Sequence, residues 1–278
     1  MKKLSAKVTI IVLCIALLTL SLGLTACGRN EPEEGITRIR VGATPRPHME
    51  ILQFIAPYLL EEGIELYLIE FTEFGLVNPA LSQNQIDANY FQHVPFLHSY
   101  IEASGNQLHI VGDVHVEPMG AYSQTLSHID ELFYGATVAI PDDATNGPRA
   151  LFLLESYGFL VMDRAPGFRA GVNDILENPL NLQFIELAAA MLPRIFLDNQ
   201  ADLSIINTNH VLSGAPHINP VEDSLIMESR YGNPYANVLV VRPEDAENPA
   251  VLTLLRHLQS ERVRQFILEN YDGVVPVF

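Results

Sequence analysis

Arg149 is the basic side chain whose sequence surroundings best fit an anion site. It lies in the segment NGPRAL, shortly after a predicted strand that ends at Pro141. Asn146 can cap a helix that begins here, and Pro148 suits the first turn of that helix. Free N–H groups at a helix N-terminus, together with a guanidinium, can hold a carboxylate through paired hydrogen bonds. The alternative is a surface arginine paired with Asp142 or Asp143.

A second group of candidate residues lies in the segment NYFQHV. Tyr90 and Phe91 end a predicted strand and His93 follows it. Side chains at the carboxyl ends of strands are the ones that reach a ligand cleft in α/β proteins. The alternative places both aromatic residues in the core and makes His93 a hydrogen-bonded structural residue.

Asparagines supply the remaining polar candidates. Asn207 and Asn209 follow an apolar run, and Asn237 lies in the segment YANV. Their amide groups could bind a polar solute, but asparagines at strand ends also commonly form turns.

Motifs of the common enzyme classes are missing from the sequence. It contains no G-x-S-x-G elbow, no HExxH and no phosphate-binding P-loop. His93 and His98 are five positions apart, and His109 and His115 are six apart, so neither pair has the i, i+4 spacing of a helical metal site. We therefore expect a binding protein without catalytic activity, cofactor or metal, with a metal-binding lipoprotein as an alternative.

Strand-like and helical segments alternate along the chain. Strands are expected at residues 38–43, 64–71, 87–91, 136–141, 182–187, 202–207 and 237–242. Apolar residues at helical spacing predict helices in between and two more near the C-terminus. This alternation predicts an α/β fold with parallel sheets that are covered by helices on both faces.

A short sequence echo suggests two similar lobes. NQID at 84–87 and NQAD at 199–202 each lead from a predicted helix into a predicted strand. The expected lobes are residues 37–118 together with 237–278, and residues 119–236. Two extended crossings, near 115–123 and 234–241, would join the lobes around a cleft, and clefts between lobes are where small ligands bind.

The N-terminal residues predict export and lipid attachment. Lys2, Lys3 and Lys7 precede an apolar run over 8–24, and small residues then lead to Cys27. This is the pattern of a bacterial lipoprotein signal, with cleavage after residue 26, lipidation of Cys27 and a polar tether over 27–36. An uncleaved membrane anchor is the alternative reading of the apolar run.

The composition narrows the class of partner. The formal net charge is −17, and every lysine would leave with the signal, so the mature protein would be more acidic still. Such a surface repels nucleic acids and anionic lipid headgroups. Cys14 would also leave with the signal, so the mature chain would hold no thiol besides the lipidated one.

With these residues in view, the chain resembles the methionine-binding lipoproteins of bacterial ABC importers, the NlpA family. The resemblance rests on ordered blocks from about residue 40 to the C-terminus: VGATPRPHMEIL (41–52), GIELYLIEF (63–71), DANYFQHVPFL (87–97), VHVEPMGAYS (114–123), GATVAIPDDATNGPRAL (135–151), ENPLNLQFIEL (177–187) and PYANVLVVR (234–242).

The resemblance implies a two-lobed periplasmic-binding fold, type II-like, that holds methionine between the lobes. Arg149 would bind the carboxylate, and Asn207 and Asn237 the amino-acid head. The residues implied to surround the ligand side chain are Phe74, Tyr90, Phe91 and His93. Phe74 departs from the family pattern, which has tyrosine there, and 209–230 matches poorly, so no role is assigned in that segment.

The implied setting is the outer face of a cell membrane. The protein would be lipid-anchored there, would hand methionine to a permease with its ATPase, and would bind no nucleic acid. Two alternatives stay open: a solute that is a methionine-containing dipeptide or another apolar amino acid, and a non-transport role as an adhesin or metal-handling lipoprotein.

Overall fold

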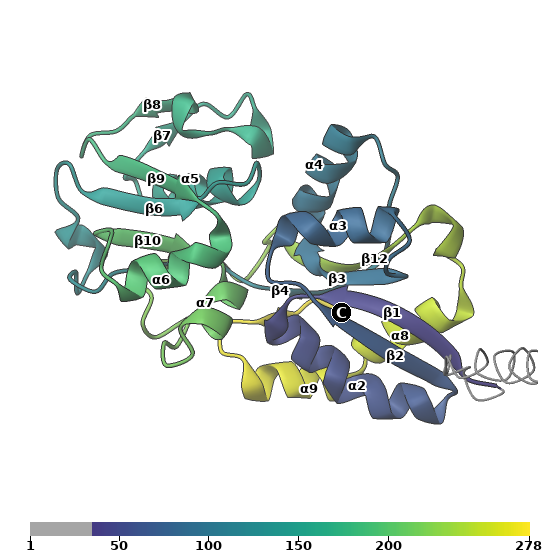
Figure 1. Ribbon diagram of the computed structural model, residues 1–278. Helices are drawn as coiled ribbons and strands as arrows, with labels where there is room; N and C mark the ends of the chain where they lie inside the picture. The colour runs from purple at the N-terminus through teal and green to yellow at the C-terminus, as the bar shows by residue number, and fades with distance from the viewer. Residues whose placement is uncertain (1–34) are drawn as a thin grey trace, which may run out of the picture. The chain divides into compact units, whose positions relative to one another are not determined.

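The computed structural model describes residues 35–278, in which two main β-sheets organise the chain (Figure 1). The first sheet has the strand order β13-β4-β12-β3-β1-β2. Its strands are β1 (Thr37–Ala43), β2 (Ile64–Glu70), β3 (Ala88–His93), β4 (His109–Val116), β12 (Ala236–Val241) and β13 (Val275–Pro276). Strands from both ends of the described chain therefore build this sheet.

The first sheet is mixed, which corrects the expectation of parallel sheets. β1 pairs in parallel with β2 and β3, whereas β12 runs antiparallel to both β3 and β4. The parallel part comes from strand–helix–strand crossovers. β12 runs opposite to β3 and β4 because the chain returns to this sheet from the second one. The local sequence pattern of a strand does not encode its direction in the sheet.

Successive side chains of β12 point to opposite faces of the sheet and pack into two apolar layers. Leu239 and Val241 pack with the helices α2 (Glu50–Glu61), α8 (Pro249–Leu258) and α9 (Glu261–Asn270). Val238 and Val240 pack on the other face with α3 (Phe74–Ser82) and α4 (Val94–Ser104). Helices thus cover both faces of the first sheet, as the period-2 alternation of a central strand requires.

The second sheet has the order β11-β5-β10-β6-β9 and is also mixed. Its strands are β5 (Gly120–Tyr122), β6 (Thr137–Pro141), β9 (Gln183–Leu187), β10 (Leu203–Ile206) and β11 (Ile226–Met227). α5 (Asn146–Ser156) packs on one face, and α6 (Leu192–Leu197) with α7 (Thr208–Gly214) on the other. A small hairpin, β7 (Val161–Met162) with β8 (Ile175–Glu177), completes this region.

The NQID and NQAD segments form equivalent turns in the two sheets. Asn84 and Asn199 both adopt positive φ, 58° and 50°, a conformation that asparagine tolerates better than most residues. Asp87 then accepts a hydrogen bond from the Arg40 N–H, and Asp202 accepts one from the Thr137 N–H. In both sheets, the shared sequence therefore supplies an aspartate that hydrogen-bonds to the backbone of a neighbouring strand.

Two short segments connect the sheets. The first crossing lies between β4 and β5 and includes Glu117, and the second lies between β11 and β12 and includes Glu228. The second sheet is therefore an insertion between two strands of the first. We refer to the regions around the first and second sheets as lobe 1 and lobe 2.

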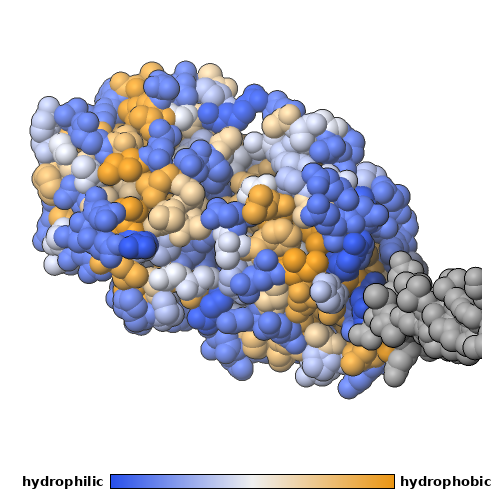
Figure 2. All heavy atoms as spheres, viewed as in Figure 1, coloured by the Kyte–Doolittle hydropathy of each residue, from blue (hydrophilic) through white to orange (hydrophobic). Residues whose placement is uncertain are grey.

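Most side chains on the face drawn in Figure 2 are hydrophilic, with smaller apolar patches between them. Within residues 35–278, no helix combines the length and apolar character that spanning a membrane requires. The predicted signal and Cys27 lie outside the residues that the structure describes.

Candidate functional site

A small cavity brings together side chains from both lobes and from the first crossing. Its lining comprises Phe74, Phe91, Gln92, His93, Phe96, Glu117, Arg149, Asn207, Asn209 and Asn237. Six of the seven residues predicted to bind ligand are in this set, and Tyr90 is not. The cavity has a volume of about 20 Å³, which is room for about one water molecule. A larger solute therefore requires the lobes or the lining side chains to move.

Arg149 is held at the centre of this site by both crossings. It lies in the first turn of α5 and is 3% exposed. Its Nε and Nη2 donate to the Glu228 carboxylate at 2.8 and 2.7 Å, and Nη2 also donates to the Glu117 carbonyl at 2.7 Å. The ring of Tyr235 lies 4.1 Å from the guanidinium carbon. Burial lowers the pKa of Arg149, but the charge and hydrogen bonds of Glu228 outweigh burial and raise it.

The paired hydrogen bonds of Arg149 therefore go to an internal carboxylate, not to Asp142 or Asp143. Asp143 instead accepts from the backbone N–H of Thr145 and Asn146 at the start of α5. It takes the capping role that we expected of Asn146. Among residues 35–278, no hydrogen bond engages Nη1 of Arg149.

Asn146 links the two lobes across the cavity. Its Oδ1 lies 3.1 Å from Nε2 of His93 and accepts from Nδ2 of Asn207 at 2.9 Å. Burial, followed by the nearby charge of Arg149, lowers the pKa of His93 to about 3. His93 is therefore neutral near pH 7, and its role here is to donate or accept hydrogen bonds, not to carry charge.

Asn207 presents an unused acceptor at the cavity. It is 6% exposed, and its Oδ1 has no hydrogen-bond partner among the described residues. A buried carbonyl oxygen without a donor costs roughly 1–3 kcal/mol. This position therefore favours a solute that brings an N–H group.

Three phenylalanines form one wall of the cavity. The ring centroid of Phe74 lies 6.0 Å from that of Phe91 and 5.9 Å from that of Phe96. His210 also packs against Phe74, with ring centroids 4.7 Å apart. The wall suits an apolar or polarizable side chain.

Tyr90 lies behind the site and not in its wall. Phe91 and Tyr90 are neighbours on β3, so their side chains point to opposite faces of the sheet. Phe91 packs with α3 and α4, whereas Tyr90 packs in the core formed with α2 and α9. The Tyr90 hydroxyl is hydrogen-bonded to Nδ1 of His115.

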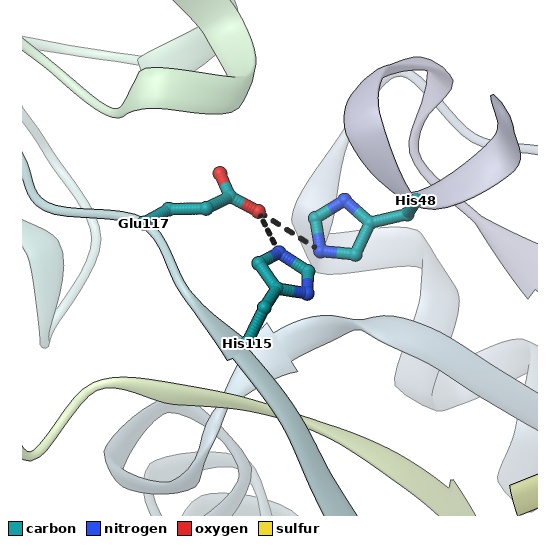
Figure 3. Close-up of side chains that lie close together, drawn as sticks. All are labelled: His48, His115 and Glu117. Carbon is teal, nitrogen blue, oxygen red and sulfur yellow. Dashed lines mark hydrogen bonds and ion pairs between the residues drawn. The ribbon is translucent and has the colours of Figure 1, made fainter. Parts of the chain in front are cut away.

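Glu117 is the charged residue of the cavity that sequence reasoning missed. Its Oε1 lies 2.6 Å from Nε2 of His115 and 3.2 Å from Nε2 of His48, as Figure 3 shows. His48 Nε2 is also 3.0 Å from Oδ1 of Asn237. Glu117 is 5% exposed, and burial raises the pKa of its carboxyl group despite the opposing effects of His48 and Arg149.

Burial also keeps both histidines of this cluster neutral. It lowers the pKa of His48 to about 4 and that of His115 to about 3. Two neutral imidazoles can each donate one N–H to the Glu117 carboxylate.

Gln92 and Phe96 also line the cavity, and sequence reasoning missed them as well. The available signal for Glu117 was an acidic residue inside the predicted first crossing.

The site combines a cation, a carboxylate, amide groups and an aromatic wall. A zwitterion with an apolar side chain offers the complementary groups. Within the described residues, the cavity lining contains no serine, cysteine or lysine that could act as a nucleophile.

Comparisons with known proteins agree with this architecture. The sequence profile of the NlpA lipoprotein family matches residues 39–278. The methionine-binding lipoprotein MetQ of Bacillus subtilis is 34% identical over 255 residues, covering 91% of this chain and 92% of that protein.

Solved structures give the same result. A nutrient-binding protein from Burkholderia cenocepacia bound to methionine has a TM-score of 0.82 at 36% identity, with 86% of this chain and 100% of that chain covered. A periplasmic substrate-binding protein of an ABC transporter from Coxiella burnetii has a TM-score of 0.80 at 34% identity, with 86% and 100% covered. These neighbours confirm the predicted two-lobed binding-protein fold. The chain belongs to the NlpA lipoprotein family.

Proposed function

We propose that this protein binds methionine between its two lobes and delivers it to an ABC importer. The observation that carries the proposal is the pairing, in one interlobe cavity, of Arg149 and Glu117 with a wall of three phenylalanines. A relative of the same fold, at 36% identity, was solved bound to methionine.

The solute carboxylate would meet Nη1 of Arg149. Glu228 holds the other edge of the guanidinium through two hydrogen bonds, so the free nitrogen has a fixed direction. Charge-assisted bonds of this kind contribute about 1.5–3 kcal/mol each.

The solute ammonium would lie between Glu117 and Asn207. The carboxylate of Glu117 faces the cavity, and Oδ1 of Asn207 lacks a donor within residues 35–278. Asn237 would act more indirectly, because its Oδ1 already lies 3.0 Å from His48. The thioether would contact Phe74, Phe91 and Phe96, while Tyr90 would support the site through His115.

Titration calorimetry with the full-length protein in detergent tests this assignment. We expect saturable 1:1 binding of methionine without chemical change in the recovered ligand. Glu117→Gln and Asn207→Ala should each weaken binding, and des-amino methionine should bind poorly to the wild type. Methionine binding that is unchanged in Glu117→Gln and Asn207→Ala would contradict the placement of the ammonium.

A thermal-shift screen separates methionine from the other solutes. Only true ligands raise the melting temperature by mass action. Methionine should stabilise the protein more than leucine or glycyl-methionine does. A larger shift with the dipeptide would move the assignment to a dipeptide-binding protein.

Binding is also expected to change the arrangement of the lobes. The cavity of about 20 Å³ cannot admit an amino acid unless it opens, so the free protein must sample a wider cleft. Small-angle scattering should give a smaller radius of gyration with methionine than without it. The proposed lobe boundaries are 118/119 and 236/237. An equal radius at saturation would contradict closure about the two crossings.

We further propose that Cys27 carries the lipid anchor and that the permease and its ATPase receive the solute. The support is the signal pattern in the sequence and the membership of a lipoprotein family. A fatty-acid probe should label the wild type and not Cys27→Ala. Label that persists on Cys27→Ala would remove this cysteine as the attachment point.

A further inference from the structure

The cluster of His48, His115 and Glu117 has the composition of a metal site. His48 comes from the helical turn η1 (Pro45–Met49), and His115 and Glu117 come from the end of β4 and the first crossing. One donor atom from each residue lies within 4.8 Å of the other two, and all three residues are buried. Two imidazoles and one carboxylate are a donor set that zinc uses in sites with an open fourth position.

Both histidines are oriented by their second ring nitrogen. Nδ1 of His48 lies 2.9 Å from the Thr44 hydroxyl, and Nδ1 of His115 is hydrogen-bonded to the Tyr90 hydroxyl. Nε2 of each ring consequently points toward Glu117 (Figure 3). Metal-binding histidines are usually fixed in this way by a partner on the other nitrogen.

The hydroxyl partners also permit the tautomer that a metal needs. A hydroxyl can either donate or accept a hydrogen bond. If the proton of each histidine moves to Nδ1, the hydroxyls of Thr44 and Tyr90 can accept a hydrogen bond from the Nδ1–H groups. Both Nε2 atoms then have a free lone pair to bind a metal.

The coordination sphere would be open toward the ligand cavity. Glu117 and Asn237 both line that cavity, and Oδ1 of Asn237 lies 3.0 Å from Nε2 of His48. Zinc ligands in a tetrahedral site lie roughly 3.3 Å apart, as bond lengths of about 2.0–2.1 Å require. The Glu117 oxygen therefore needs to withdraw from His115 by less than about 1 Å.

We propose that His48, His115 and Glu117 bind a divalent first-row transition ion, for which Zn²⁺ is the probe. Imidazole and carboxylate donors suit zinc, copper and nickel better than calcium or magnesium. The acidic charge of the protein, −17 over the whole chain, favours cations near it.

The site has a consequence for the solute, and this part rests on the proposed function. A divalent ion bound to Glu117 would repel a methionine ammonium held by the same carboxylate. Zn²⁺ and methionine should therefore compete, and methionine affinity should fall as the zinc concentration rises.

Calorimetry with Zn²⁺ alone tests the site without reference to methionine. The full-length protein should be purified in detergent without a histidine tag. We expect one saturable zinc site, and at least a 100-fold loss of affinity in His48→Gln and His115→Gln, because even the loss of an outer-shell partner costs about 10–100-fold. His257→Gln is the matched control, since His257 is buried and contacts Glu62 outside the cluster.

Thr44→Val provides a milder variant if a histidine variant fails to fold. It removes the partner of His48 Nδ1 and should weaken zinc binding about 10-fold. Cobalt substitution should give the absorption bands of a four-coordinate ion. The proposal is overturned if no saturable zinc binding is seen, or if His48→Gln, His115→Gln and Thr44→Val all bind zinc as the wild type does. Methionine binding that persists in that case would leave the proposed function intact.

Discussion

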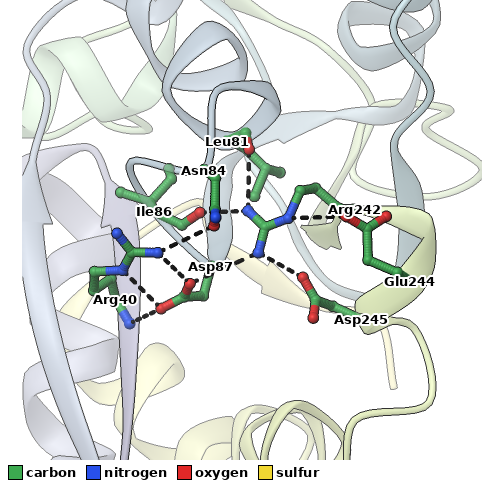
Figure 4. Close-up of polar contacts among 8 residues, drawn as sticks. All are labelled: Arg40, Leu81, Asn84, Ile86, Asp87, Arg242, Glu244 and Asp245. Atoms are coloured by element: carbon green, nitrogen blue, oxygen red, sulfur yellow. Dashed lines mark hydrogen bonds and ion pairs between the residues drawn. The ribbon is translucent and has the colours of Figure 1, made fainter.

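Two ion-paired arginines of this protein, the buried Arg149 and the partly buried Arg242, are used in different ways. Arg242 lies at the end of β12 and donates from Nη1 to the carbonyls of Leu81 and Ile86 at 3.1 and 2.7 Å (Figure 4). Its Nη2 donates to Asp245 at 2.5 Å, and its Nε lies 3.5 Å from Glu244. Every nitrogen of Arg242 is therefore engaged, and all its partners lie in lobe 1.

Arg149 contacts segments that join the lobes and keeps one nitrogen free. Its partners are Glu117 in the first crossing and Glu228 in the second. The comparison shows that burial and ion pairing alone do not distinguish a binding arginine from a structural one. The useful differences are an unused donor in a residue that lines a cavity and partners in the segments that join the lobes.

The largest expected effect is on methionine affinity in Arg149→Ala. Truncating one partner of a buried, hydrogen-bonded charge pair costs about 2–5 kcal/mol, so affinity should fall by between about 30-fold and several thousand-fold. Arg149→Lys should recover little, because an ammonium cannot hold Glu228 bidentately and also reach the solute. Calorimetry measures both, with Arg242→Ala as the control that should bind within about threefold of the wild type. Equal losses in the two alanine variants would erase the distinction between the arginines.

The reverse pattern is expected for the free energy of unfolding in Arg242→Ala. Removing the guanidinium leaves the Ile86 carbonyl without its Arg242 donor, whereas the Leu81 carbonyl keeps the hydrogen bond from the Asn84 N–H. The loss should cost about 1–3 kcal/mol. Urea denaturation measures the loss. Arg256→Ala is a matched control, because Arg256 is 60% exposed and paired with exposed Glu62, so its effect should stay below about 1 kcal/mol. An Arg242→Ala protein as stable as the wild type would show that this network is dispensable.

Acidification should affect the surroundings of the cavity before it affects the Arg242 network. Burial lowers the pKa values of His48 and His210 to about 4 and those of His93 and His115 to about 3. In the unfolded chain these histidines titrate near 6.5, so below that pH the unfolded state binds more protons. Each histidine then lowers the free energy of unfolding by up to about 1.4 kcal/mol per pH unit as the pH falls toward its folded pKa.

His210→Gln isolates one of these contributions. Between pH 7 and pH 5, its loss of stability should be smaller than that of the wild type by up to about 2 kcal/mol. The raised pKa of Glu117 acts in the opposite direction and is common to both proteins. Asp87 stays ionised over this range, because the hydrogen bonds and charge of Arg40 outweigh burial and lower its pKa. Identical pH dependence in the two proteins would mean that His210 does not titrate as its burial predicts.

The smallest expected effect concerns the aromatic wall. Norleucine keeps the length of methionine and loses only the contact between sulfur and the rings, about 0.3–1.5 kcal/mol, so it should bind roughly 2- to 12-fold more weakly. Methionine sulfoxide buries an unpaired oxygen at a cost of about 1–3 kcal/mol. Phe74→Tyr should reduce that cost by offering a donor. Competition calorimetry decides the matter, and equal affinity for methionine and its sulfoxide in the wild type would contradict a wall built from Phe74.

Local sequence patterns predicted much of this molecule. The alternation of strands and helices located the elements, and six predicted ligand residues line one cavity, although their roles remain predictions. Strand direction could not be read from these patterns, because pairing partners such as β12 and β4 lie far apart in the chain. Tyr90 was assigned to the ligand together with Phe91, from the end of the predicted strand and from the family resemblance, yet neighbours on a strand face opposite ways.

The cluster around Glu117 was beyond pattern reasoning for a different reason. His115 and Glu117 are two positions apart, but His48 comes from a turn near the start of the segment 37–118. The i, i+4 spacing of histidines identifies a metal site on a helix. A site assembled from a turn and a strand end has no fixed spacing in the sequence. Gln92 and Phe96 were likewise neighbours of predicted residues that only the folded register could place.

Lobe 2 begins and ends at almost the same point in space, and Arg149 contributes to this. Glu228 also accepts a hydrogen bond from the Met119 N–H at 2.9 Å, so the incoming and outgoing chains are fastened to each other as well as to Arg149. In polymer terms this cluster is a non-covalent cross-link that closes a loop of more than 100 residues, between Glu117 and Glu228. Closing a loop of that length costs entropy that grows only slowly with its size, and the cluster offsets part of that cost in the folded protein. Amide hydrogens in the two crossings should therefore exchange with solvent together, as one cooperative unit, and not as two independent strands.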